Sequence, residues 1–71
     1  MVLRDLLEVS NKDNSVYVKS KSEGKIVATK IGGKEYNDEY EWIDIKYLQY
    51  RVRDVSGQED RHGGGLYIVI D

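Results

Sequence analysis

The chain has 71 residues, a formal net charge of −2, and neither cysteine nor proline. This length fits one domain, over residues 1–71, and without cysteine no disulfide or thiolate zinc site can stabilise its small core. No apolar run approaches the roughly 20 residues that cross a bilayer. Arg4 and Asp5 interrupt the segment where a signal peptide would be apolar. We therefore expect a cytoplasmic protein with no membrane partner.

The first predicted element is a short amphipathic helix over residues 2–9. Leu3, Leu6 and Leu7 fall on one helical face, and the turn-forming residues of 10–14 end the helix. A helix of about eight residues is unstable alone in water. It should therefore lie against the rest of the domain.

Two β-strands are predicted next, over residues 15–21 and 25–31, with a turn at 22–24. The first strand alternates strictly, so that Val16 and Val18 face the core. The second strand has two possible registers. Its core side is formed either by Ile26 and Ala28 or by Val27, Thr29 and Ile31.

A short helical turn is predicted after the glycine break at 32–33. Asn37 is a good N-cap, and the acids that follow suit the positive end of a helix dipole. Tyr40, Trp42 and Ile43 could anchor this turn on the core. The remaining elements are a strand, a polar glycine-rich loop and a closing strand, over residues 45–55, 56–65 and 66–70.

This order of elements predicts an α+β fold with a single antiparallel β-sheet of about four strands. The N-terminal helix would cover one face of the sheet, and the short helical turn would lie between strands two and three. The predicted core consists of apolar residues from the helix and the strands: Leu3, Leu6, Leu7, Val16, Val18, Leu48, Tyr50, Val52, Leu66, Ile68 and Ile70.

The opposite face of the predicted sheet combines tyrosine with basic side chains. Its candidate interaction residues are Tyr17, Lys19, Tyr47, Arg51 and Tyr67. Tyrosines and cations on a sheet can stack single-stranded bases and hold phosphates, and the same residues suit a partner or homodimer interface. They are also ordinary on a solvated strand face. The net acidity of the chain disfavours nucleic acid, since phosphate neutralisation supplies most of that affinity.

Charge is distributed unevenly along the chain. Residues 1–34 carry seven basic and four acidic residues, whereas residues 35–71 carry four basic and nine acidic residues. Acids and aromatics gather in one short stretch, which supplies the candidate acidic patch: Glu35, Asp38, Glu39, Tyr40, Glu41 and Trp42. Either this is a solvated acidic turn, or it is an anionic surface that engages a basic partner, with aromatic anchors. Its spacing does not match a calcium loop.

No catalytic, cofactor-binding or metal-binding residue is predicted. The stretch 62–65, His-Gly-Gly-Gly, matches the letters of an esterase oxyanion segment, but the Gly-x-Ser-x-Gly nucleophile motif is missing. These glycines lead into a strand, whereas phosphate loops lead into a helix. His62 is the only histidine and has no cysteine with which to bind zinc. We therefore expect a protein that is not an enzyme and has no cofactor.

The whole chain resembles a known group of proteins in its order of segments. An LRDLLEV helix precedes an SVYVKS strand, and WIDIKYLQYRVRDV and LYIVID segments follow. This resembles the small uncharacterised proteins encoded by bacteriophages and other mobile elements of low-GC Gram-positive bacteria. The resemblance covers nearly all 71 residues and implies an acidic, cysteine-poor protein. Some small acidic phage proteins inhibit host defence enzymes, including the CRISPR nucleases.

These observations favour a small non-catalytic protein that acts through protein–protein contact. Inhibition of a host enzyme, in the manner of an anti-CRISPR protein, is the form of this function that the resemblance suggests. Two alternatives stay open: a single-stranded nucleic-acid-binding module that uses the Tyr/Arg/Lys sheet face, and a homodimeric accessory protein.

Overall fold

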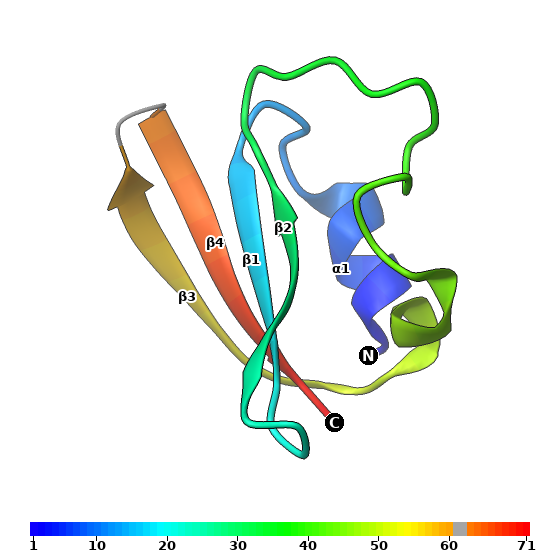
Figure 1. Cartoon of the computed structure of the whole chain (residues 1–71). Helices are drawn as coiled ribbons and strands as arrows, with labels where there is room; N and C mark the ends of the chain where they lie inside the picture. Colours follow the sequence, from blue (N-terminus) through cyan, green and yellow to red (C-terminus); the bar gives the residue numbers. More distant parts are fainter. Residues whose placement is uncertain (61–62) are drawn as a thin grey trace.

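The computed structural model of the chain describes residues 1–60 and 63–71 (Figure 1). His62, from the predicted glycine-rich loop, lies outside the described residues. The elements, in chain order, are the helix α1 (Leu3–Val9), the strands β1 (Ser15–Ser20) and β2 (Lys25–Lys30), the 3-10 helix η1 (Ile45–Gln49), and the strands β3 (Val52–Asp60) and β4 (Gly63–Ile70). Within the described ranges, no helix is long and apolar enough to cross a membrane.

The four strands form one sheet in the order β2-β1-β4-β3. The predicted α+β fold, with a single four-stranded sheet, an N-terminal helix on one face and a helical turn between strands two and three, is confirmed. The outer pairs, β1–β2 and β3–β4, are antiparallel as predicted, but the central pair, β1–β4, is parallel. A parallel neighbour requires a long connection, which the chain between β1 and β4 provides. Figure 1 shows α1 and η1 on the same side of the sheet.

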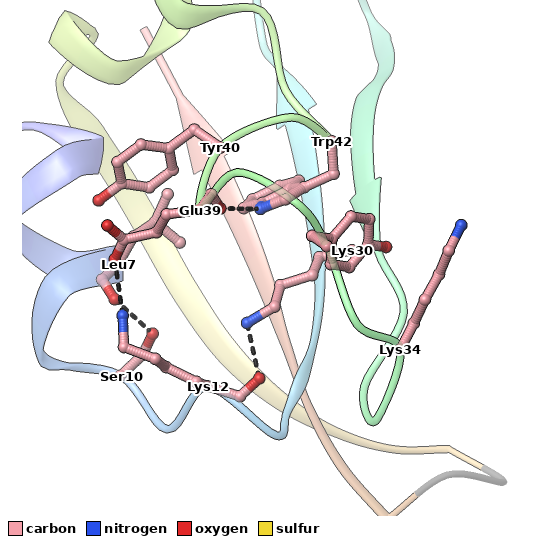
Figure 2. A pocket seen from close by; sticks show the side chains of 9 residues that line it. Leu7, Ser10, Lys12, Lys30, Lys34, Glu39, Tyr40 and Trp42 are labelled. Atoms are coloured by element: carbon pink, nitrogen blue, oxygen red, sulfur yellow. Dashed lines mark hydrogen bonds and ion pairs between the residues drawn. The ribbon is translucent and has the colours of Figure 1, made fainter.

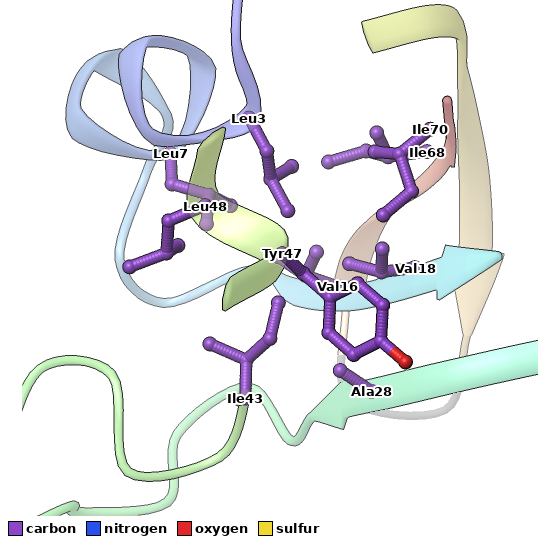
Figure 3. Close-up of a cluster of buried hydrophobic side chains, with 10 residues drawn as sticks. All are labelled: Leu3, Leu7, Val16, Val18, Ala28, Ile43, Tyr47, Leu48, Ile68 and Ile70. Carbon is purple, nitrogen blue, oxygen red and sulfur yellow. The ribbon is translucent and has the colours of Figure 1, made fainter. Parts of the chain in front are cut away.

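The core lies between the sheet and these two helical elements. Figure 3 shows its buried side chains: Leu3, Leu7, Val16, Val18, Ala28, Ile43, Tyr47, Leu48, Ile68 and Ile70. The other predicted core residues, Leu6, Tyr50, Val52 and Leu66, are partly buried and pack against this cluster. The predicted core is therefore largely confirmed, with Ala28, Ile43 and Tyr47 as additions.

The predicted strand over 45–55 is wrong in its first half. Asp44 is the N-cap of η1, and its carboxylate accepts a hydrogen bond from the backbone N–H of Lys46 at 3.1 Å. This cap begins a tight turn, in which the neighbours Tyr47 and Leu48 both point into the core. A strand would have sent them to opposite faces. The helical turn predicted near Asn37 thus lies instead at η1, several residues later in the chain.

Two further predictions need correction at the sheet edges. In β2, Val18 pairs with Ala28 but Lys19 pairs with Ile26, so a β-bulge at Val27 divides the strand. Neither predicted register is correct along the whole strand, because Ala28 faces the core and Ile26 faces away. In β3 and β4, the stretch predicted as a polar loop pairs as a hairpin up to residues 60 and 63. Polar residues can occupy an edge strand, since backbone groups form the ladder.

Candidate interaction surfaces

The open face of the sheet is the face opposite α1 and η1. Strand pairing arranges its residues in two rows that run across all four strands. One row is Thr29, Tyr17, Tyr67 and Ser56, and the other is Ile26, Lys19, Val69 and Asp54. Tyr17 and Tyr67 are therefore direct neighbours on the two central strands. No described helix covers these two rows.

Three of the five predicted sheet-face residues, Tyr17, Lys19 and Tyr67, lie on the open face. Tyr47 does not, because η1 directs its ring into the core, where only 7% of the residue is exposed. Its hydroxyl donates a hydrogen bond of 2.8 Å to Glu23, which raises the pKa of Tyr47 to about 12. Arg51 is exposed just before β3, where it forms an isolated bridge with Val2. The predicted continuous Tyr/Arg/Lys face is thus wrong for these two residues.

Strand β4 is apolar on both of its sides. Leu66, Ile68 and Ile70 face the helices, and Ile68 and Ile70 are completely buried. Tyr67 and Val69 face the other way and are half-buried, with no helical layer above them. Continuous apolar strands in parallel pairing usually have both faces covered. The central strands therefore have the character of a two-sided core, but the described helices cover one side.

The acids of the candidate patch are exposed, and three of the four bond to other groups of the protein. Asp38 accepts a hydrogen bond from the N–H of Tyr40 at 3.4 Å, and Glu41 accepts one from the N–H of Asn37 at 3.2 Å. Glu39 forms a 2.6 Å ion pair with Lys12. The hydrogen bond to Glu39 raises the pKa of Lys12. These contacts stabilise the turns and neutralise part of the predicted anionic surface.

The aromatic residues of the same segment point inward. Tyr40 and Trp42 are half-buried and pack against the core, and the Trp42 indole N–H donates to the carbonyl of Glu39 at 3.0 Å. Burial, followed by the charge of Glu39, raises the pKa of Tyr40. Both rings therefore anchor this segment to the domain and do not project from it as contacts for a partner.

A small pocket lies where this segment crosses the end of α1 and the end of β2. Its cavity is about 160 Å³, and three lysines and three aromatics contribute to its wall: Lys12, Lys30, Lys34, Tyr36, Tyr40 and Trp42 (Figure 2). The sequence did not predict this pocket, because its lining comes from two segments that lie far apart along the chain, residues 7–12 and residues 30–42. The basic surplus of residues 1–34 was the one signal of it.

Comparisons with known proteins assign no chemistry to these surfaces, and the described side chains assign none either. No protein-family model matches the chain, and no curated protein or solved structure is significantly similar to it. Within residues 1–60 and 63–71, no group of three or more His, Cys, Asp or Glu side chains is placed to hold a metal ion.

Proposed function

We propose that this protein is a small non-catalytic binding module of the phage or mobile-element type, which acts in the cytoplasm by covering a partner protein with the open face of its sheet. The observation that carries the proposal is that β4 has apolar side chains on both faces of the sheet, whereas the described helices cover one of these faces. Inhibition of a host defence enzyme is one form that such binding takes.

The composition of the open face supports a protein partner. Tyr17 and Tyr67 lie side by side at its centre, and tyrosine is enriched in the buried centres of interfaces. Ile26 extends the apolar surface at the β2 edge, with 43% of the residue exposed. Lys19 and Asp54 provide charged groups in the same row as Val69.

The same arrangement gives less support to nucleic-acid binding. That function needs base-stacking rings and phosphate-binding cations on one surface. Tyr47 is buried in the core, and Arg51 lies outside the four strands. The open face therefore has one ring and one cation fewer than predicted. The cation that stays, Lys19, shares its row with the carboxylate of Asp54.

An affinity capture with matched variants tests the proposal. Tagged wild-type protein and the variants Val69→Lys and Val9→Lys would each be incubated with nuclease-treated lysate of a low-GC Gram-positive host. Val9 lies on α1 and is 78% exposed, so it controls for the replacement of an exposed valine by lysine. Circular dichroism would show that each variant is folded.

We expect the wild type and Val9→Lys to capture one host protein in stoichiometric amount, and Val69→Lys to lose it. Capture that survives Val69→Lys would contradict the use of this face. Capture of nothing by the wild type, together with a dimeric mass in light scattering, would favour self-association and contradict the proposal of a host partner.

A further inference from the structure

The pocket beside Trp42 has the size of a single ring. Its cavity of about 160 Å³ is lined by Tyr36, Tyr40 and Trp42 together with Leu7 of α1. An apolar cavity of about 150 Å³ is known to hold benzene, whereas sites for drug-sized ligands start near 300 Å³. Aromatic walls favour stacked or edge-on contacts with another ring. Shape and lining thus suit one planar ring.

The pocket also has a surplus of positive charge. Lys12 and Glu39 neutralise each other at 2.6 Å, which leaves Lys30 and Lys34. Lys30 is half-buried, and its ammonium donates a 2.7 Å hydrogen bond to the backbone carbonyl of Lys12 (Figure 2). Burial and then the ammonium of Lys12 lower the pKa of Lys30, with Asp13 and Glu39 acting in the opposite direction. An anion in the pocket would relieve this repulsion, because it stabilises both ammonium groups.

Lys34 adds to this character. The Lys34 ammonium lies 5.1 Å from the centre of the Tyr36 ring, so a cation lies directly at the aromatic wall. The Tyr40 ring contributes to the wall, but its hydroxyl is buried and lies on the α1 side of the ring, away from the Lys30 ammonium (Figure 2), so the positive charge of the pocket comes from its lysines.

We infer that this pocket binds a small aromatic anion, a single ring that carries a carboxylate or phosphate group. The ring would lie among Tyr36, Tyr40 and Trp42, and the anionic group would lie near Lys30. This site is separate from the open face of the sheet and does not depend on the proposed function.

Trp42 is the only tryptophan of the chain, so its fluorescence reports on the pocket directly. Benzoate and phenyl phosphate would be titrated into the intact protein at constant ionic strength. Benzyl alcohol provides the ring without the charge, and inorganic phosphate provides the charge without the ring. We expect a saturable fluorescence change with at least one aromatic anion, at a concentration at least tenfold lower than with either control compound.

The variant Lys30→Met should weaken this binding at least tenfold, and Lys30→Arg should restore part of it. Lys25→Met is the matched control, because Lys25 lies on the same strand, is exposed and does not line the pocket. No saturable change with either aromatic anion would overturn the inference, as would binding that Lys30→Met leaves intact. Equal affinity for inorganic phosphate would also overturn it, because the aromatic wall would then play no part.

Discussion

The two faces of the sheet are built from the same central strands, yet they differ in what covers them. On the helix side, Val18, Ile68 and Ile70 are completely buried under α1 and η1. On the open side, Tyr17, Tyr67 and Val69 stay half-buried. A chain of this size buries only about 60% of the surface that its unfolded form exposes. The comparison teaches that the central strands are apolar on both faces although the described helices cover one, which is the basis of the proposal that a partner covers the other.

Two adjacent residues of β4 test most strongly whether the two faces of the sheet differ in burial. Ile68→Ala empties a completely buried site and should reduce the free energy of unfolding by about 2–5 kcal/mol. Val69→Thr changes the half-buried open face with nearly constant shape and should cost less than about 1 kcal/mol. Urea unfolding of the isolated protein measures both values. Similar losses would mean that Val69 is already covered within the monomer.

Two glycines, one buried and one exposed, differ in the space around the position that a Cβ would occupy. A Cβ at the buried Gly32 would lie 2.4 Å from the Asp13 carbonyl oxygen and 2.9 Å from the Ser15 nitrogen, and backbone atoms cannot easily move away. Gly32→Ala should therefore destabilise the protein by about 1–3 kcal/mol. A Cβ at Gly57 of β3 meets nothing within 4 Å, so Gly57→Ala should stay within about 0.5 kcal/mol. Thermal unfolding compares the two, and equal losses would contradict this packing.

Asp71 makes one end of the covered face sensitive to acid. Its carboxylate accepts hydrogen bonds from the hydroxyls of Ser20 and Ser22, at 3.0 and 2.5 Å, and from the N–H groups of Lys21 and Ser22, at 2.9 and 3.2 Å. The bond from Ser22 is the main cause of the lowered pKa of Asp71. This contribution to stability is present above the unfolded pKa, near 3.9, and is lost as the pH falls through the lower folded value.

The variant Asp71→Asn should therefore lose part of the decline in stability below about pH 4. The measurement is the urea midpoint of both proteins between pH 6 and pH 3. At pH 6 the variant should be less stable, by less than Gly32→Ala, and the two curves should converge at low pH. Parallel curves would contradict the role of Asp71.

The smallest predicted effect concerns Tyr47 at alkaline pH. Its pKa is raised to about 12, mainly by the hydrogen bond to Glu23. The folded state therefore keeps this proton above the unfolded pKa of about 10, and stability declines between about pH 10 and pH 12. Among the six tyrosines, the Tyr47→Phe variant should remove one high-pH step from the ultraviolet titration. An unchanged high-pH step would contradict the assignment.

The sequence predicts the regular parts of the fold well. The spacing of Leu3 and Leu7 and the alternation of Val16 and Val18 are direct signatures of one covered face. The turn at Tyr47 and Leu48 was missed, since these residues sit in a stretch whose alternation continues into β3. Only the cap by Asp44 distinguishes a 3-10 turn there from a strand.

The candidate sites were less predictable, because they depend on contacts between distant segments. Tyr17 and Tyr67 were placed on one face correctly, but their direct pairing follows from the parallel central pair, which local patterns do not encode. The pocket brings Lys12, Lys30 and Trp42 together from two distant segments. Its charge therefore comes from the order of the fold and not from the acidic stretch around Trp42.

The most direct test of the central claim measures whether a host component covers the open face. Because the chain has no cysteine, single variants Ser56→Cys and Val9→Cys provide one reactive thiol each, on the open face and on the exposed side of α1. Maleimide labelling rates would be compared in buffer and in concentrated, nuclease-treated host lysate, with a free thiol peptide to correct for lysate effects. We predict that Ser56→Cys is protected several-fold in lysate while Val9→Cys is not. Equal corrected rates at the two sites would contradict the claim that a partner protein covers the open face.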